Sequence, residues 1–269
     1  APIPASTICS PRGKPSHEPA GPLPSAHPAA RSAKGKPVSL AASAPAETGR
    51  VAPAAVLFDL DGTLVDSAPD LAGAVNDLRG VHGLEPLPFT QLRPVVGSGA
   101  RGMLAAGFGI CPEDPRFAAL REDFLARYEG RLLRETRVFA RMEPVLQVLQ
   151  TRGVPWGIVT NKVARFAAPL VAGLGLRERC AVLVSGDTTP HAKPHPAPLL
   201  AAAAALHLQP VHCVYIGDDR RDVQAGRGAG MRTLAAAWGY LGAGESVHDW
   251  AADAVLDQPE ALLNWLGLA

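Results

Sequence analysis

The sequence lacks several features that would assign it to a class at once. Its 269 residues carry a formal net charge of +1, so no strong field favours nucleic acid or an anionic membrane as a partner. No run of about 18 or more apolar residues occurs, which argues against a transmembrane helix. The four cysteines form no C-x-x-C pair, and we interpret them as free thiols in a reducing compartment. We therefore expect a cytoplasmic protein.

The first 53 residues lack aromatic side chains altogether and differ in composition from the rest. They hold 11 of the 26 prolines, mixed with Ala, Ser and Gly. They also carry six Lys or Arg against two Asp or Glu, so the remainder of the chain is mildly acidic. Such a segment buries too little apolar surface to offset the entropy of ordering it. We expect residues 1–53 to form a disordered Pro/Ala/Ser-rich tail.

From residue 54 the pattern becomes regular, because short apolar runs alternate with helical patterns. The runs read as buried parallel strands and cover 54–60, 154–160, 181–185, 211–217 and 232–238. The helical patterns cover 143–153, 165–176, 196–208 and 222–230. This alternation predicts an α/β fold: a Rossmann-like, three-layer core in which helices cover both faces of a parallel sheet.

One interval, residues 70–137, breaks this alternation, because it contains helical patterns and no convincing strand. We expect it to be an α-helical cap domain inserted after the first strand. The catalytic core would then comprise residues 54–69 and 138–269. Ligands of open α/β sheets bind at the carboxyl ends of the strands, so an insertion leaving from that edge would cover the site.

Two carboxylates, Asp59 and Asp61, follow the first strand in the segment VLFDLDGTLV. Their two-residue spacing places both side chains on the same face of an extended chain, where they repel each other. The pair has three interpretations: a structural cap of the following turn, half of a metal site, or a nucleophile with a neighbouring acid/base. The ends of the other strands bear on this choice.

Further site chemistry follows the later strands. Thr160 and Asn161 end one strand and offer a hydroxyl and an amide to an anion. Lys193 stands before a proline at a helix entry, and Asp218 and Asp222 follow another strand. Carboxylates, a lysine and a hydroxyl at one sheet edge suit an oxyanion with a hard divalent cation. Asp219, which lies between the two later acids, is expected to be solvated and outside the direct chemistry.

Four segments, in chain order, resemble the signature motifs of the haloacid dehalogenase superfamily. They are DLDGT (59–63), VTN (159–161), KPHP (193–196) and GDDRRD (217–222). The resemblance covers residues 54–269 and implies a Rossmann-like core with a C1-type cap. It also implies phosphoryl chemistry, because the dehalogenases of the superfamily lack the equivalent of Asp61.

The resemblance implies a role for each acid and for the lysine. Asp59 would be the nucleophile that forms an aspartyl-phosphate, and Asp61 the general acid and then base. Mg²⁺ would be held by the Asp59 carboxylate, the Asp61 backbone carbonyl and Asp218. Lys193 would neutralise the charge shared by nucleophile and phosphate, and Asp222 would orient that lysine.

The same resemblance assigns the phosphoryl oxygens to Thr160 and to backbone amides near Leu60 and Asn161. The implied activity is hydrolysis of a phosphomonoester in a small phosphorylated metabolite. Two alternatives stay open: a sugar phosphomutase, which shares all four motifs, and a non-catalytic member that serves as a binding module. We expect a monomer or a weak homodimer.

The segment VVGSGARGM (95–103) is the candidate for substrate recognition in the helical interval. Ser98 lies between two glycines, and Arg101 follows, so backbone N–H groups and a guanidinium would suit a carboxylate. The alternative is a helix N-terminus with a surface arginine. The wider sequence resembles phosphoglycolate phosphatases and, more closely, N-acetylmuramic acid 6-phosphate phosphatases. Both substrates carry a carboxylate, so Arg101 does not separate them, whereas the volume of the cavity would.

Overall fold

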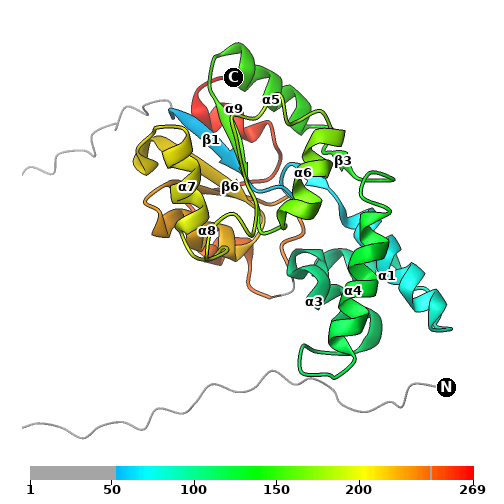
Figure 1. Ribbon diagram of the computed structural model, residues 1–269. Helices are drawn as coiled ribbons and strands as arrows, with labels where there is room; N and C mark the ends of the chain where they lie inside the picture. The colour runs from blue at the N-terminus through cyan, green and yellow to red at the C-terminus, as the bar shows by residue number, and fades with distance from the viewer. Residues whose placement is uncertain (1–52, 243) are drawn as a thin grey trace, which may run out of the picture.

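The fold is built on a six-stranded sheet, seen in a computed structural model that describes residues 53–242 and 244–269 (Figure 1). All pairs in this sheet are parallel, and the strand order is β5-β4-β1-β6-β7-β8. The strands are β1 (Ala55–Phe58), β4 (Trp156–Val159), β5 (Val182–Val184), β6 (Cys213–Gly217), β7 (Arg232–Ala236) and β8 (Ala254–Leu256). The predicted α/β class is confirmed. Apart from Pro53, the predicted disordered tail lies outside the described residues.

Helices cover both faces of the sheet, because the side chains of each central strand alternate between two cores. Val56 and Phe58 of β1 belong to the core beneath α5 (Met142–Thr151), α6 (Ala164–Gly173) and α9 (Ala261–Leu266). Ala55 and Leu57 belong to the core beneath α7 (Ala197–Ala205) and α8 (Arg220–Gly228). This alternation is the period-2 geometry of a strand buried on both sides, and it makes the three-layer architecture.

The sequence pattern did not predict the edge strand β8. It has three residues, of which Ala254 and Val255 are only partly buried, and Asp253 and Asp257 flank it. A run this short carries no period that a pattern can detect. It pairs with β7, from Leu234↔Ala254 to Ala236↔Leu256, at the edge of the sheet. This pairing depends on the tertiary fold and not on the local sequence.

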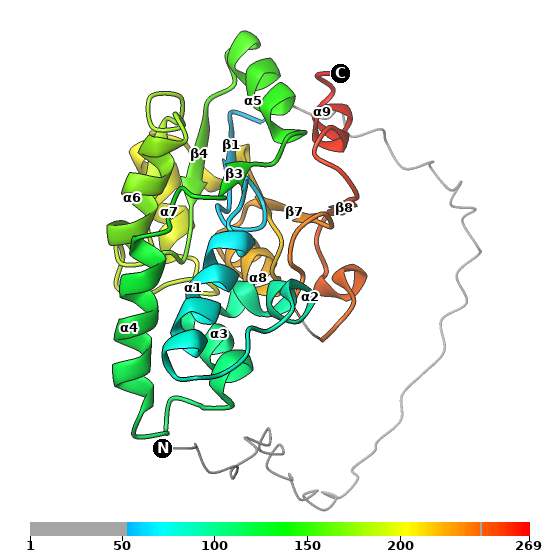
Figure 2. The same cartoon turned by 90° about the vertical axis from the view of Figure 1, so that its right-hand side faces the viewer.

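Between β2 (Val65–Asp66) and β3 (Arg137–Val138) the chain forms a helical insertion, which we define as residues 68–129. Its elements are α1 (Ala68–Val81), α2 (Phe89–Leu92), the 3₁₀ helix η1 (Arg93–Ser98), α3 (Gly99–Phe108) and α4 (Phe117–Glu129). The two connecting strands pair antiparallel with each other. Figure 2 shows α1, α3 and α4 grouped at one end of the sheet.

A buried carboxylate fixes the base of the helical insertion. Asp70, in the first turn of α1, accepts hydrogen bonds from the backbone N–H groups of Glu135 (3.0 Å) and Thr136 (2.8 Å) and from the Thr136 hydroxyl (2.8 Å). These hydrogen bonds tie the outgoing chain to the returning chain. No helix in the described part of the chain combines the length and the apolarity needed to cross a bilayer.

Two neighbouring leucines of α7 test the packing of the core. Leu199 is fully buried, whereas Leu200 is 42% exposed. We expect Leu199→Ala to lower the free energy of unfolding by about 2–5 kcal/mol, because it leaves a cavity against the sheet. Leu200→Ala should change it by about 0.5 kcal/mol or less. Urea unfolding of both variants measures the difference, and equal losses would contradict this packing.

Candidate active site

The carboxyl ends of three adjacent strands meet in one cavity of about 310 Å³. Asp59 follows β1, Thr160 follows β4 and Asp218 follows β6. Because β1 lies between β4 and β6, the first position after each strand comes to the same edge of the sheet. The cavity wall includes eight of the nine residues that the sequence predicted as site residues: Asp59, Asp61, Ser98, Thr160, Asn161, Lys193, Asp218 and Asp222.

The Lys193 ammonium is the centre of a buried polar network. Its Nζ lies 2.8 Å from Asp59 Oδ1 and 2.7 Å from Asp222 Oδ1. It also donates hydrogen bonds to the Tyr215 hydroxyl (2.7 Å) and the Val159 carbonyl (3.0 Å). Burial opposes the charge on Lys193, but Asp222 and Asp59 outweigh it and raise the pKa of the ammonium. The lysine is therefore held as a cation against the predicted nucleophile.

Burial raises the pKa of Asp59 to about 7. The ammonium of Lys193 opposes this shift, whereas the charges of Asp222 and Asp61 add to it. The backbone N–H of Leu60 donates to Asp59 Oδ1 at 2.7 Å and fixes the direction of the carboxylate. One lysine thus compensates only part of the negative charge gathered here, and a further cation would hold Asp59 ionised.

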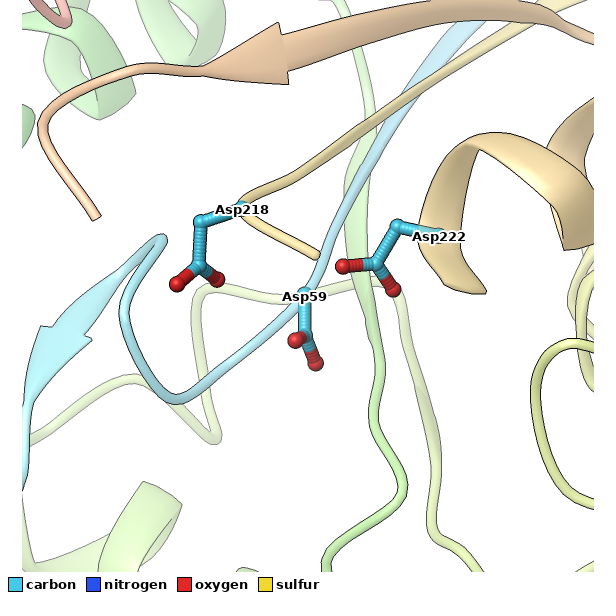
Figure 3. A group of neighbouring side chains, drawn as sticks. All are labelled: Asp59, Asp218 and Asp222. Carbon is cyan, nitrogen blue, oxygen red and sulfur yellow. The ribbon is translucent and has the colours of Figure 1, made fainter. Parts of the chain in front are cut away.

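Asp218 is a buried carboxylate held by one hydroxyl and one backbone amide. The Thr63 hydroxyl donates to Oδ1 at 2.9 Å, and the Tyr240 N–H donates to Oδ2 at 2.8 Å. Burial raises the pKa of Asp218 well above its usual range, and Asp59 adds to the shift. Carboxylate oxygens of Asp59, Asp218 and Asp222 lie within 4.8 Å of one another, and Figure 3 shows the three side chains gathered around one point.

The cluster fits a hard divalent cation, because it offers carboxylate oxygens whose negative charge exceeds the positive charge nearby. Both oxygens of Asp222 already have partners: Oδ1 accepts from Tyr215 at 3.0 Å and Oδ2 from the Asp219 N–H at 3.1 Å. Asp222 also forms an ion pair with Lys193, which Asp218 does not within the described part of the chain, and this agrees with the supporting role predicted for Asp222. Gly62 makes the approach possible: it has φ +85°, and an added Cβ would lie 2.1 Å from Asp218 Oδ2.

Asp61 has a different set of partners from its neighbour. The Ser67 hydroxyl donates to Asp61 Oδ1 at 2.5 Å, and Lys162 Nζ lies 3.1 Å from Oδ2. Burial opposes the charge on Lys162, but Asp61 and then Tyr128 outweigh it and raise the pKa of the ammonium. Lys162 and Ser67 were not among the site residues predicted from the sequence. The position of Lys162, directly after the VTN motif at a strand end, was the available signal.

Thr160 and Asn161 play unequal parts. Thr160 is buried, and its Oγ1 accepts the Lys162 N–H at 3.1 Å, which leaves the hydroxyl proton available to a ligand. The Asn161 side chain instead exchanges two hydrogen bonds of 2.9 Å with the backbone of Lys193. Asn161 therefore positions the lysine, and its backbone amide, rather than its side chain, is the candidate ligand for a phosphoryl group.

The structure does not bring Arg101 to the cavity. Ser98 lines it together with Gly97 and Gly99, but Arg101 is exposed and absent from the wall. The reason is helical geometry: α3 starts at Gly99 and buries Met103 and Leu104, so Arg101 falls on the outer face. The alternative interpretation, a surface arginine, describes its position.

Another arginine, Arg121 of α4, lines the cavity in place of Arg101. Asp219 also borders the cavity, as the N-cap of α8, where its side chain accepts the Arg221 N–H. The Arg221 guanidinium holds both Asp219 oxygens and donates to the Gly97 carbonyl at 2.6 Å. These partners agree with a role for Asp219 outside the direct chemistry.

Comparison with known proteins identifies the class of this α/β enzyme. Residues 56–236 match the family of haloacid dehalogenase-like hydrolases, and the chain belongs to that family. A crystal structure of a predicted phosphoglycolate phosphatase from Haemophilus somnus 129PT shares the fold, with a TM-score of 0.71 and 24% identity. The match covers 81% of this chain and 100% of the other. The resemblance drawn from the four motifs is confirmed.

Two curated relatives carry different names. A Xanthomonas campestris pv. campestris (strain 8004) protein named phosphoglycolate phosphatase is 47% identical over 210 residues, 78% of this chain and 95% of the relative. A Pseudomonas aeruginosa (strain PAO1) protein named N-acetylmuramic acid 6-phosphate phosphatase is 41% identical over 215 residues, 80% and 95% of the two chains. The chain is thus a hydrolase whose relatives are named as phosphatases, which argues against the non-catalytic alternative.

A divalent cation bound by Asp59 and Asp218 should compete with protons, because burial raises the pKa of both carboxyl groups. Only the ionised forms bind a cation, so affinity falls as the pH falls. With one competing proton, we expect the apparent Kd for Mg²⁺ to rise about tenfold per pH unit below pH 7. Calorimetric titration at pH 6 and pH 8 measures the change, with Asp218→Asn as the variant that should lose binding. A Kd independent of pH would contradict this assignment.

Proposed function

We propose that this hydrolase is a Mg²⁺-dependent phosphomonoesterase that works through an aspartyl-phosphate. The observation that carries the proposal is the unequal setting of the two acids after β1. Asp59 is held against the Lys193 ammonium at 2.8 Å, whereas Asp61 is held by Ser67 and Lys162 on the cavity side of the same turn. Two carboxylates in unlike settings suit unlike roles, one as a nucleophile and one as an acid/base.

In the first half of the reaction, an Asp59 oxygen attacks phosphorus, and the bond between phosphorus and the ester oxygen breaks. Asp61 gives its proton to the departing oxygen, which leaves as an alcohol. In the second half, Asp61 as a carboxylate takes a proton from water while that water attacks phosphorus and releases Asp59. Lys193 and the Thr160 hydroxyl stabilise the negative charge on the phosphoryl oxygens.

Asp59 and Asp218 would hold the Mg²⁺, together with the backbone carbonyl of Asp61. When bound, the ion supplies positive charge that polarises the phosphoryl group and keeps the nucleophile ionised. Asp222 acts through Lys193, and Tyr215 completes that network by accepting from the lysine and donating to Asp222 Oδ1. We further propose that the enzyme acts in the cytoplasm, in line with the cysteine pattern of the sequence.

The volume and the apolar lining of the cavity support a sugar-sized substrate. A volume of about 310 Å³ lies at the lower end of the roughly 300–1,000 Å³ typical of ligand pockets. A two-carbon acid such as 2-phosphoglycolate would leave much of it to water. Apolar side chains, Phe124, Leu125 and Phe166, line the part contributed by α4 and α6 and suit the face of a sugar ring. We propose N-acetylmuramic acid 6-phosphate, or a phosphorylated sugar acid of similar size, as the substrate.

Asp59→Asn tests the mechanism, because the amide keeps the shape of the carboxylate and removes the nucleophile. We expect the rate of phosphate release with Mg²⁺ to fall by roughly 10³-fold or more. Asp257→Asn, an exposed change after β8, is the matched control and should keep full activity. A phosphate-release assay on both variants measures the effect, and unchanged turnover in Asp59→Asn would exclude the mechanism.

The choice of substrate is tested by kinetics of the native protein. We expect kcat/KM for N-acetylmuramic acid 6-phosphate to exceed that for 2-phosphoglycolate by at least about tenfold, because only the larger substrate contacts the apolar wall. Steady-state assays of phosphate release with both compounds provide the comparison. A preference for 2-phosphoglycolate would show that the cavity closes around a smaller molecule than its volume indicates.

A further inference from the structure

The two lysines of the folded part both lie in the cavity. Residues 53–269 contain 18 arginines but only two lysines, Lys162 and Lys193. Both line the cavity wall, and both side chains are at least nine-tenths buried. An ammonium is a compact charge that fits where a planar guanidinium does not. The mechanism gives Lys193 a task, whereas Lys162 has none beyond its contact with Asp61.

The backbone holds Lys162 in a fixed position after β4. Its carbonyl accepts the Gly186 N–H at 2.9 Å, and its N–H donates to Thr160 Oγ1 at 3.1 Å. The side chain lies over the Tyr128 ring, with Nζ 4.7 Å from the ring centre and 3.1 Å from Asp61 Oδ2. An ammonium carries three N–H donors. Asp61 and the Tyr128 hydroxyl are its side-chain partners among the residues that the structure describes, so one N–H remains for a ligand.

A second polar group, the Tyr128 hydroxyl, faces the same part of the cavity. The side chain is buried and lines the cavity. Its hydroxyl interacts with the Lys162 ammonium, but its O–H finds no acceptor within the described part of the chain. A buried O–H without an acceptor is costly, and such groups mark places where a ligand supplies the acceptor. Lys162 comes from the core and Tyr128 from the helical insertion, so a ligand bound by both would bridge the two.

The position of this pair relates it to the leaving group. Lys162 lies next to Asp61, the acid that protonates the departing oxygen in the proposed function. Tyr128 shares one face of α4 with Arg121, Phe124 and Leu125, since residues three, four and seven positions apart align on a helix. This face is the apolar wall on which the organic part of the substrate would lie.

We propose that Lys162 and Tyr128 form the subsite that recognises a carboxylate on the leaving group of the substrate. One carboxylate accepts from both an ammonium N–H and the phenolic O–H, whereas a neutral hydroxyl leaves the charge of Lys162 without a new partner. This assignment rests on the proposed phosphatase function. It replaces Arg101, which lies outside the cavity, as the residue that selects an acidic substrate.

The test compares phosphate esters that carry a carboxylate with similar esters that lack it. N-Acetylmuramic acid 6-phosphate is paired with N-acetylglucosamine 6-phosphate, which lacks the acidic side chain, and 2-phosphoglycolate is paired with ethyl phosphate. In each pair the ratio of kcat/KM, acidic over neutral, measures recognition of the carboxylate. We expect Lys162→Met to lower this ratio by roughly 10- to 100-fold, mainly through a higher KM for the acidic ester. Lys162→Arg should restore only part of it, because the guanidinium has a different shape.

Tyr128→Phe removes only the hydroxyl and keeps the buried ring. We expect it to lower the same ratio by about 3- to 10-fold without loss of thermal stability. This variant and Lys162→Gln keep the test decisive if Lys162→Met does not fold. Arg152→Gln, an exposed change at the end of α5, is the control and should leave the ratio unchanged.

Three outcomes would overturn the assignment. If the Lys162 variants lower kcat equally for acidic and neutral esters, Lys162 only positions Asp61. If the ratio stays at its native value in the Lys162 and Tyr128 variants, the pair does not contact the carboxylate. If the native protein releases phosphate from none of the four esters with Mg²⁺, the proposed function fails, and the subsite fails with it.

Discussion

The Lys193 ammonium, buried between the carboxylates of Asp59 and Asp222, is the interaction on which the site depends. Several acids meet at one edge of the sheet, and without a central cation their mutual repulsion and burial would keep them protonated. The protein therefore surrounds this cation with four oxygen atoms, two of them from the Tyr215 hydroxyl and the Val159 carbonyl. Val159 takes part only through its backbone carbonyl, and Tyr215 lies outside the four signature motifs, yet both orient the lysine toward the nucleophile.

The fold supplies this arrangement through the order of its strands. Asp59 directly follows β1. Lys193, which balances its charge, lies in the loop after β5, and Asp222, which orients that lysine, lies in α8 after β6. The Asn161 side chain exchanges two hydrogen bonds with the Lys193 backbone, so the loop after β4 fixes the lysine segment from 32 residues away. A change in the register of either neighbouring strand would move the lysine relative to Asp59. The precision of the site is thus a consequence of the parallel pairing.

The sequence predicted the core of the fold and most of the site, because both leave signals in the local pattern. Five of the six strands in the main sheet are buried apolar runs, and the acids follow them directly. Three features could not be predicted from the sequence, for physical reasons. The edge strand β8 is too short to show a period. The exposure of Arg101 depends on which residue starts α3. The contact between Lys162 and Tyr128 joins a core loop to α4, and no single segment records such a contact.

The core and the helical insertion contribute different groups to the cavity, and Asp61 lies where these two parts of the chain meet. The strand ends of the core provide the groups that act on phosphorus. The helical insertion provides the wall on which the rest of the substrate would lie. Asp61 is held from both sides, by Ser67, which directly precedes α1, and by Lys162 of the core loop, which also touches α4 through Tyr128. The position of the proposed acid therefore depends on how the insertion sits on the core. A substrate that draws α4 and the core loop together would also set the acid for its own leaving oxygen, so recognition and proton transfer would share the same contacts.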